Sequence, residues 1–276
     1  MNILLFGSNG NLGNQLVKKF IEDKKIHKIF LIDIEINSKI KSKRIKYINF
    51  KSLKNFVLKD KIEIVIFASF IMNFKEADPN EYLKKNIRII KNGLSFLSIN
   101  KIKKFIYFSS VAVYGNQKKP CDEKARTNPI NIYGKTKLHI EKLIQKKSKN
   151  AKFKYLILRL PHMYGPKIKN NFIYFFLRNK DKIIINGDGS QIRNLLHVHN
   201  LYNFILKAIT FKNNNIFNLS NEEFSLNSIL KMIGATPKYR SAIKEPKYQK
   251  IISKKAKKLF GWQPKFKLKS NIKYIL

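Results

Sequence analysis

Short apolar runs alternate with longer amphipathic stretches along the first 160 residues of the chain. The runs lie at residues 3–6, 29–32, 47–50, 64–68, 105–108 and 155–158. Unbroken apolar runs of this kind are typical of strands buried on both faces, and the stretches between them have the spacing of helices. The pattern therefore predicts an α/β fold, a doubly wound parallel sheet with helices on both faces.

After residue 160 the pattern becomes shorter and less regular. Prolines and asparagine-rich clusters, such as residues 186–189 and 213–215, divide the chain into small pieces. This punctuation is typical of loops and short elements. We therefore expect residues 1–160 to form the doubly wound domain. Residues 161–276 are expected to form a smaller α+β lobe, with some segments returning to the first domain.

Composition narrows the class of protein. Of the 276 residues, 44% are hydrophobic, which is enough for a packed core. Cys121 is the single cysteine, which excludes an internal disulfide and a multi-cysteine metal site. The first residues lack the basic segment of a signal peptide, and every apolar run is far shorter than the roughly 20 residues of a spanning helix. We expect a cytoplasmic protein with no membrane partner and no bound metal.

The charge of the chain is extreme, since 57 Lys and Arg residues face 17 Asp and Glu residues, a net charge of +40. Such a balance suggests nucleic acid, an anionic membrane or a phosphorylated small molecule as a partner. The lysines, however, are spread from Lys18 to Lys273 without a basic block or a recognisable nucleic-acid-binding module. We interpret them as a solvated background and expect no nucleic-acid partner.

A glycine-rich turn connects the first predicted strand to the first predicted helix. It carries Gly7, Gly10 and Gly13. In dinucleotide-binding proteins such glycines permit a tight turn, let backbone N–H groups approach a diphosphate, and let the helix pack on the sheet. A plain structural turn is the alternative interpretation.

Asp33 stands at the end of the second predicted strand, where a carboxylate can accept hydrogen bonds from both ribose hydroxyls of an adenosine. The same carboxylate would repel a 2′-phosphate, and no arginine precedes Arg44. Together with the glycine turn, Asp33 predicts a Rossmann-type domain that binds NAD in preference to NADP. A strand-end turn residue is the alternative for Asp33.

Tyr133 and Lys137 are one helical turn apart at the start of a predicted helix, so they share one face of it. A free tyrosine has a pKa of about 10, but a nearby ammonium stabilises the phenolate, which could then take a proton from a sugar hydroxyl. Ser110 ends the fifth predicted strand and could hold the reacting oxygen. Each motif is weak alone, because lysine-rich helices and capped serine turns are common.

Taken together, these residues resemble the extended short-chain dehydrogenase/reductase family, in its NAD-dependent nucleotide-sugar epimerase/dehydratase branch. The resemblance covers nearly the whole chain. Its further motifs are Asp78-Pro79 with Asn86, and residues 109–115, 159–166, 187–193, 197–199, 217–220 and 253–264.

The resemblance implies that Ser110, Tyr133 and Lys137 form the catalytic triad, with Tyr133 as acid/base and Lys137 also on the nicotinamide ribose. It implies that Ser110, His162 and Arg193 bind the substrate, a nucleotide-diphosphate sugar whose diphosphate suits the forked guanidinium of Arg193. The residues expected at NAD are Gly7, Asn9, Gly10, Asn11, Leu12, Gly13, Asp33, Asn49, Ala68, Asn86, Tyr133 and Lys137.

The chain also departs from the family pattern. The dehydratases of the branch carry an acid pair where this chain has Val111 and Ala112, so we do not expect elimination chemistry. Asn49 stands where an acid is expected at the adenine. His162 replaces an asparagine, and a loop histidine without a substrate contact is equally compatible with the sequence. The chain is shorter than typical members, chiefly after residue 166. The nucleotide pocket is therefore the part of the site about which the resemblance implies least.

The implied function is that of a NAD-dependent nucleotide-sugar epimerase, which oxidises C4 of a hexose, lets the 4-keto sugar rotate, and reduces C4 from the other face. A NAD(P)H-dependent 4-keto-sugar-nucleotide reductase would use the same triad. A catalytically silent NAD-binding or nucleic-acid-binding protein of the same fold is the third alternative. A homodimer is also expected, through the helices that carry Tyr133 and Asn86, although lysines such as Lys142 and Lys146 would oppose it by like-charge repulsion.

Overall fold

The computed structural model describes two compact units, each assembled from segments that are distant in sequence. Its described residues are all except 36–39, 41, 73–77, 103, 118, 152, 170, 242–246 and 249, and it leaves aside the side chains of Asn55 and Ala151. The first unit consists of Met1–Ser109, Asn131–Leu158 and Ile209–Ile216. The second consists of Ser110–Ile130, Arg159–Ala208 and Phe217–Leu276.

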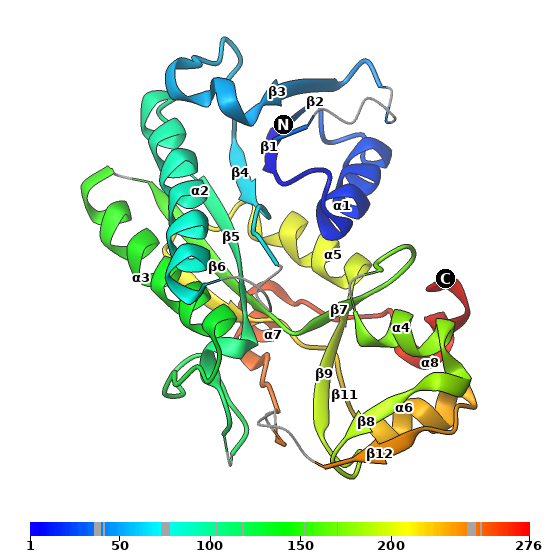
Figure 1. Ribbon diagram of the computed structural model, residues 1–276. Helices are drawn as coiled ribbons and strands as arrows, with labels where there is room; N and C mark the ends of the chain where they lie inside the picture. Colours follow the sequence, from blue (N-terminus) through cyan, green and yellow to red (C-terminus); the bar gives the residue numbers. More distant parts are fainter. Residues whose placement is uncertain are drawn as a thin grey trace. The chain divides into compact units, whose positions relative to one another are not determined.

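A seven-stranded sheet forms the centre of the first unit (Figure 1). Its strands are β1 (Asn2–Phe6), β2 (Lys28–Asp33), β3 (Ile45–Asn49), β4 (Ile64–Phe67), β5 (Lys104–Ser110), β6 (Lys154–Leu160) and β10 (Asn215–Asn218). They follow the order β10-β6-β5-β4-β1-β2-β3, and β1 pairs in parallel with both β2 and β4. The strand order reverses at β1, which is the switch point where open α/β sheets bind ligands. The predicted fold class is confirmed.

Three helices of the first unit cover this sheet. In Figure 1, α1 (Asn11–Glu22) lies on one face, and α2 (Pro79–Ile99) and α3 (Ile132–Ala151) lie side by side on the other. Buried side chains of the strands, such as Phe67, pack with Ile90 of α2 and Ile140 of α3 in one apolar core. Burial on both faces explains why the strands carry unbroken apolar runs.

The ends of two elements show how local chemistry sets their limits. Asp78 caps α2 by accepting a 2.8 Å hydrogen bond from the backbone N–H of Glu81, and a proline follows it at the first helical position. Asn49 accepts a 2.8 Å hydrogen bond from the N–H of Lys51 and so begins the 3₁₀ helix η1 (Phe50–Asn55). The strand predicted at residues 47–50 therefore ends at Asn49.

Among its described residues, the second unit contains two small sheets and five α-helices. Strands β7 (His162–Tyr164), β9 (Ile192–His197) and β11 (Glu222–Ser225) form one sheet in the order β11-β9-β7, and β8 (Ile184–Asn186) pairs with β12 (Lys238–Arg240). The helices are α4 (Phe172–Arg178), α5 (Val198–Ala208), α6 (Leu226–Ile233), α7 (Lys254–Phe260) and α8 (Leu268–Asn271). This unit takes in residues 110–130 and 159–160, which the sequence analysis places in the first domain, and leaves residues 209–216 to the first unit.

A buried polar cluster joins three sequence segments of the second unit. Arg159 donates a 2.8 Å hydrogen bond to the hydroxyl of Tyr114, which lies 2.7 Å from Oδ1 of Asn218. Asn218 in turn donates to the carbonyl of Cys121 at 3.2 Å. Tyr114, Arg159 and Asn218 all belong to motifs of the family resemblance, so these motif residues hold the fold of the unit.

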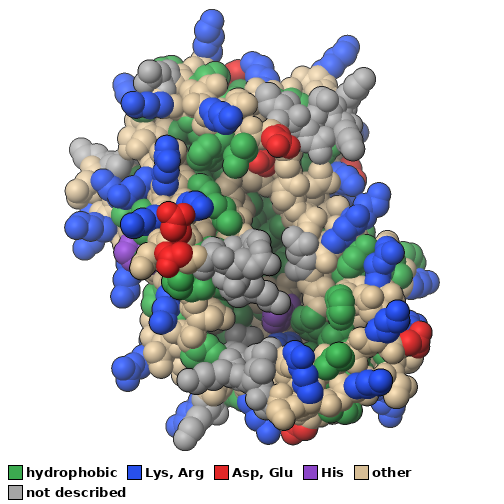
Figure 2. All heavy atoms as spheres, viewed as in Figure 1, with side chains coloured by type: hydrophobic (Ala, Val, Ile, Leu, Met, Phe, Trp, Pro, Cys, Tyr) green, Lys and Arg blue, Asp and Glu red, His purple; other side chains and the backbone are tan. Residues whose placement is uncertain are grey.

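On the visible face of the molecule (Figure 2), the positive side chains are spread out, as the sequence predicts. Figure 2 shows Lys and Arg side chains scattered over the visible face, with apolar and uncharged side chains between them. Among the described helices, none combines the length and the apolar character that crossing a membrane requires.

Candidate functional site

The glycine turn between β1 and α1 is as tight as the sequence predicts. Gly7 has a φ of +80°, and a Cβ atom there would lie 2.7 Å from the backbone nitrogen of Ser69. A Cβ atom on Gly13 would lie 2.0 Å from the carbonyl oxygen of Gly7. Side chains are therefore excluded at both positions, which brings α1 against the turn.

The N-terminus of α1 is open to an anion. Gly10 is its N-cap residue and Asn11 and Leu12 are its first helical residues, and no described side chain caps this end. The first N–H groups of the helix thus lack a side-chain acceptor, and the helix dipole adds positive potential. A diphosphate is the type of group that such an end binds.

The carboxylate of Asp33 lies beside this turn. Its Oδ2 accepts a 2.8 Å hydrogen bond from the N–H of Asn9, and its Oδ1 accepts one from the N–H of Ile34. The side chain of Asn9 donates to the carbonyl of Glu35 at 2.5 Å. The fold thus brings together the end of β2 and the glycine turn. Because each carboxylate oxygen has two lone pairs, Asp33 can accept further hydrogen bonds.

Two other residues predicted at the cofactor have structural hydrogen bonds in the first unit. Asn86 of α2 is 1% exposed, accepts a 2.9 Å hydrogen bond from the N–H of Ile71, and donates to the carbonyl of Tyr82 at 3.1 Å. The N–H of Ala68 donates to the carbonyl of Phe6 at 3.0 Å. These bonds fasten the segment after β4 to α2 at one end and to β1 at the other.

Tyr133 and Lys137 lie in the first two turns of α3. Lys137 is 5% exposed, and its ammonium donates a 2.8 Å hydrogen bond to the carbonyl of Phe108 on β5. It lies 5.8 Å from the ring centre of Tyr133. Burial lowers the pKa of Lys137 to about 7, although the carboxylate of Glu141 acts in the opposite direction. The predicted pair is therefore close together, with its cation in a dry environment.

A buried carboxylate accompanies this pair. Glu141 lies one turn after Lys137 on α3 and is 1% exposed, and its Oε1 accepts a 2.5 Å hydrogen bond from Oγ of Ser109. Ser110, the next residue, ends β5, and its own Oγ accepts a 3.2 Å hydrogen bond from the N–H of Ala112. Ser110 belongs to the second compact unit and Tyr133 to the first.

Besides Ser110, the second unit holds the predicted substrate residues His162 and Arg193. His162 begins β7 and pairs with Leu195 of β9, so Arg193, two residues earlier on β9, faces the same side of the sheet. Burial and the charge of Arg193 together lower the pKa of His162 to about 4, burial being the larger cause. The imidazole is therefore neutral at pH 7, so one ring nitrogen can donate a hydrogen bond and the other can accept one.

Val111 and Ala112 lie in the 3₁₀ helix η2 (Val111–Tyr114), directly after Ser110. Val111 is 3% exposed, and η2 carries no acidic side chain. The dehydratase acid pair is thus absent from both the sequence and this described helix.

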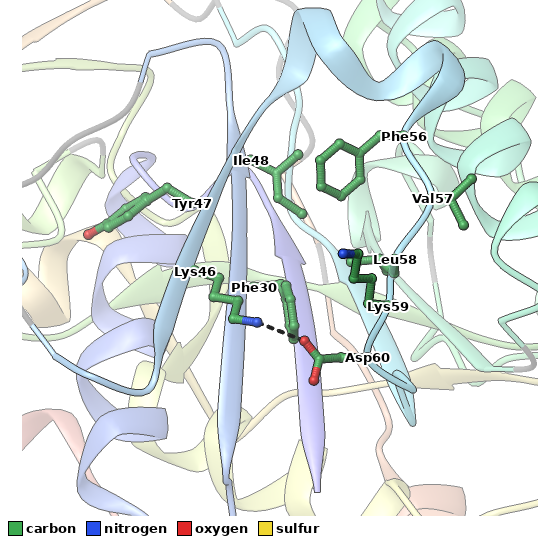
Figure 3. Close-up of a pocket in the computed structure, with 9 residues that line it drawn as sticks. All are labelled: Phe30, Lys46, Tyr47, Ile48, Phe56, Val57, Leu58, Lys59 and Asp60. Atoms are coloured by element: carbon green, nitrogen blue, oxygen red, sulfur yellow. Dashed lines mark hydrogen bonds and ion pairs between the residues drawn. The ribbon is translucent and has the colours of Figure 1, made fainter.

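A hollow of about 500 Å³ lies beside β2 and β3, outside the predicted site. Figure 3 shows its apolar wall and the ion pair between Lys46 and Asp60. Its lining residues are Phe30, Lys46, Tyr47, Ile48, Phe56, Val57, Leu58, Lys59 and Asp60, and none of them is a predicted site residue.

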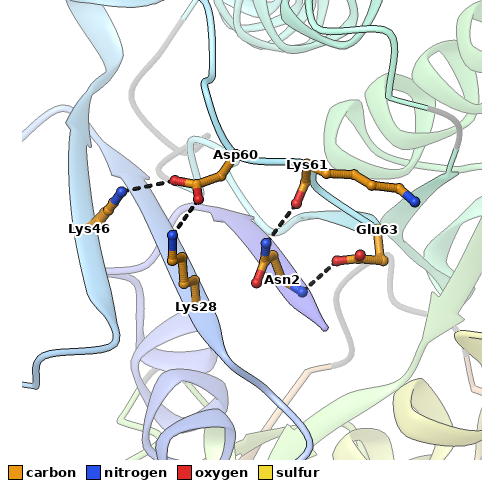
Figure 4. A network of polar contacts seen from close by, with 6 residues as sticks. All are labelled: Asn2, Lys28, Lys46, Asp60, Lys61 and Glu63. Carbon is orange, nitrogen blue, oxygen red and sulfur yellow. Dashed lines mark hydrogen bonds and ion pairs between the residues drawn. The ribbon is translucent and has the colours of Figure 1, made fainter.

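The same edge of the sheet carries a polar network, drawn in Figure 4. Asp60 accepts hydrogen bonds from Lys28 and from Lys46, the latter at 2.9 Å, and these bonds lower the pKa of its carboxyl. Asn2 donates to the carbonyl of Lys61 at 2.8 Å. The contacts tie the starts of β1 and β2 to the segment before β4, so we interpret the network as structural.

Sequence reasoning missed two residues near the predicted pair Tyr133 and Lys137. Glu141 has a readable signal, because it continues the four-residue spacing of Tyr133 and Lys137 on one helix face. Phe70 has none. It follows β4, and its ring meets Lys137 and Tyr133 only through the packing of α3 on the sheet.

Known proteins resemble this chain along nearly all of its length. The model of the family described as NAD dependent epimerase/dehydratase matches residues 3–220. A Methanocaldococcus jannaschii protein, provisionally named UDP-glucose 4-epimerase, is 27% identical over 99% of this chain and 97% of its own length.

Solved structures show the same fold. A Thermotoga maritima UDP-glucose 4-epimerase with UDP-glucose has a TM-score of 0.88 at 23% identity, over 100% of this chain and 97% of that one. A Bacillus cereus UDP-glucuronic acid 4-epimerase in complex with UDP-glucuronic acid and NAD has a TM-score of 0.85 at 23% identity, over 100% of this chain and 98% of that one.

Proposed function

The chain belongs to the NAD dependent epimerase/dehydratase family, and we propose that within this family it is a 4-epimerase of nucleotide-diphosphate sugars. The observation that carries the proposal is the placement of Lys137, a buried ammonium one helical turn from the phenol of Tyr133. The names of similar proteins, which are 4-epimerases of UDP-sugars, support the reaction and make UDP-hexoses the first substrates to test.

The family's cofactor, NAD, fits the turn between β1 and α1. Gly7 and Gly13 leave the backbone bare there, the N-terminus of α1 would take the diphosphate, and the remaining lone pairs of Asp33 would accept the adenosine ribose hydroxyls. Arg44 donates to the carbonyls of Asp23 and Ile26, so its guanidinium is already engaged in the loop between α1 and β2, which supports NAD over NADP. When bound, NAD supplies the hydride acceptor and donor for C4 of the sugar.

The chain's own residues would move the proton. Tyr133, as a phenolate stabilised by the Lys137 ammonium, would take the proton of the C4 hydroxyl and later return it to the 4-keto oxygen. Lys137 would also donate to the nicotinamide ribose. Ser110, at the end of β5, would hold the sugar oxygen during both transfers.

The substrate proposal rests on His162 and Arg193 in the second unit. The guanidinium of Arg193 would bind the diphosphate of the sugar nucleotide, since its fork of donors suits phosphate oxygens. The neutral imidazole of His162 would offer a hydrogen bond to the same substrate. In this proposal residues 1–160 mainly bind NAD and residues 161–276 mainly bind the sugar nucleotide.

The deciding experiment is turnover without added cofactor. The purified protein is incubated with UDP-, dTDP-, GDP- and CDP-hexoses, and the configuration at C4 is followed by NMR. We expect interconversion of C4 epimers of a UDP-hexose, with NAD released on denaturation of the protein. Reduction of a 4-keto sugar nucleotide with stoichiometric consumption of NADH would instead identify a reductase and reject the epimerase.

The Tyr133→Phe variant tests the mechanism itself. It should abolish turnover while NAD binding, measured by calorimetry, is retained. Undiminished activity in this variant would reject Tyr133 as the acid/base.

A homodimer through α2 and α3 is part of the proposal. The exposed side of α3 carries Lys142, Lys146 and Lys147, so self-association there would bring like charges together. We therefore expect a dimer that strengthens with ionic strength, because salt screens this repulsion. Sedimentation equilibrium at 50 and 500 mM NaCl measures it, and a salt-independent monomer would reject the dimer.

A further inference from the structure

Phe70 lies against the two residues to which the proposed chemistry assigns the proton transfer. The ammonium nitrogen of Lys137 is 3.7 Å from the centre of the Phe70 ring. The same ring meets the ring of Tyr133 edge-on, with centroids 5.5 Å apart and planes at 88°. Phe70 thus contacts both the cation and the phenol, and all three residues belong to the first compact unit.

The ammonium of Lys137 lies among several aromatic rings. Besides Phe70, the ring centre of Tyr107 is 5.0 Å and that of Tyr133 is 5.8 Å from the nitrogen. Ring faces attract cations through their quadrupoles, and the attraction grows when the cation is desolvated. The carbonyl of Phe108 accepts one of the three N–H donors at 2.8 Å. The rings and this carbonyl therefore replace the water that the buried ammonium has lost.

The position of Phe70 is fixed from both sides. The N–H of Ala68 donates to the carbonyl of Phe6, and the N–H of Ile71 donates to the side chain of Asn86. The ring of Phe70 also packs edge-on against Tyr82 of α2, with centroids 6.0 Å apart. The backbone on each side of Phe70 is held to a different element, so its ring is placed by the fold.

Opposing influences act on the charge of Lys137. Burial lowers the pKa of this ammonium to about 7, and the carboxylate of Glu141 on the same helix raises it. Among the described residues, the other titratable groups around it are the phenols of Tyr133 on α3, Tyr107 on β5 and, beyond Phe70, Tyr82 on α2. Near neutrality the ammonium and the amine are therefore balanced, and a modest stabilisation of the ammonium changes its population.

We propose that Phe70 is a positioning residue, whose ring stabilises the ammonium form of Lys137 and holds the phenol of Tyr133 beside it. This inference rests on the proposed function, because it gives Phe70 its importance through Tyr133 and Lys137. Phe70 itself takes no part in the chemistry.

The test titrates Lys137 directly, without turnover. Protein labelled with [ε-¹³C]lysine is followed by NMR from pH 5 to 11, and the Lys137 resonance is the one that the Lys137→Met variant lacks. The Phe70→Leu variant removes the ring but keeps an apolar side chain. In this variant the titration midpoint of Lys137 should fall by roughly half to one pH unit. Phe70→Met is the second variant if Phe70→Leu does not fold.

Two controls separate the ring from general packing. Phe70→Tyr keeps an aromatic face and should leave the Lys137 midpoint unchanged to within about 0.2 pH units, which is roughly what such a titration resolves. Phe56→Leu changes another partly buried phenylalanine of the same unit, at the hollow of Figure 3, and should also leave it unchanged. An unchanged midpoint in both Phe70→Leu and Phe70→Met would overturn the proposal.

Turnover is measured separately on the same variants. If epimerisation occurs, kcat/KM at pH 7 should fall about threefold in Phe70→Leu, as the ammonium fraction falls. If the wild-type protein shows no epimerisation but the midpoint shifts, the role of Phe70 stands and the proposed function fails. If epimerisation occurs but the midpoint does not shift, the proposed function stands and the role of Phe70 fails.

Discussion

The carboxylate of Glu141 accepts a 2.5 Å hydrogen bond from the hydroxyl of Ser109, and both groups are buried. This bond joins α3 to β5, one residue before Ser110 on the strand and one turn after Lys137 on the helix. A buried carboxylate needs partners, and here one partner is a hydroxyl while the nearby cation is Lys137. Glu141 therefore contacts β5 through Ser109 and acts on the charge of Lys137.

Removing the charge of Glu141 should alter the pH dependence of the reaction. Glu141→Gln keeps a carbonyl oxygen for Ser109 but deletes the negative charge that raises the pKa of Lys137. The ammonium should then lose its proton about one pH unit earlier. We expect the alkaline limb of the kcat/KM profile to move to lower pH by that amount. Glu81→Gln, at an exposed residue paired with Lys85 on α2, is the control that should leave the limb in place.

Two glycines of the β1–α1 turn should respond differently to the same substitution. Gly13→Ala places a Cβ atom 2.0 Å from the carbonyl oxygen of Gly7, so α1 must shift, at a cost of about 3 kcal/mol or more in the free energy of unfolding. Gly10→Ala meets the same oxygen at 3.4 Å with a φ of −63°, which alanine accepts. Urea denaturation and NAD calorimetry should show an unstable Gly13→Ala and a stable Gly10→Ala with weakened NAD binding. Equal stability of the two variants would contradict this account.

Six strands of the sheet were predictable, because each contains a short apolar run. The seventh, β10, was not, since its apolar run is only Ile216 and Phe217 between two asparagines. The end of β3 was not, since Asn49 ends the strand by capping η1, and an asparagine fits a strand end or a cap equally well. We expected some later segments to return to the first domain, but which segments do so was not readable from the sequence. This depends on which distant segments pack together, such as 209–216 with the first unit.

In the candidate site, too, the sequence predicted some features and not others. Tyr133 and Lys137 were found from helical spacing, which is a local property. The contact of Phe70 with Lys137 joins the segment after β4 to α3, so no local pattern encodes it. The hydrogen bonds of Asn86 were also not predictable, because an asparagine on a helix does not reveal which backbone group it will bind.

Arg193 should be irreplaceable by lysine for substrate binding. Arg193→Lys keeps a positive charge near His162 but loses the planar fork of donors. We expect KM for the sugar nucleotide to rise about tenfold or more, equivalent to about 1.4 kcal/mol, with NAD binding unchanged. In Arg193→Met the charge is lost as well, so the pKa of His162, now about 4, should rise in an NMR titration, whereas Arg193→Lys should keep it low. An unchanged KM in both variants would remove Arg193 from the substrate site.

The stability of the second unit should depend on the pH through His197. Its ring is 2% exposed, stacks on Phe266 at 4.9 Å, and accepts a hydrogen bond from the N–H of His199 on Nδ1. Burial, and secondarily His199, lowers the pKa of His197 to about 3, against about 6.5 in the unfolded chain. The unfolded state therefore takes up the proton first as the pH falls. The stabilisation is complete above about pH 6.5 and is lost toward pH 3, by about 3 kcal/mol at pH 4.

The variant that checks this origin is His197→Asn, whose side-chain oxygen can still accept the hydrogen bond from His199. We expect it to be less stable than the wild-type protein at pH 7, because the stacking on Phe266 is lost. Its free energy of unfolding should nevertheless fall less steeply between pH 6.5 and 4, since one titrating group is gone. His139→Asn, at an exposed residue of α3, should keep the wild-type slope. Urea denaturation at half-unit pH steps measures all three proteins, and a wild-type slope in His197→Asn would assign the acid sensitivity to other groups.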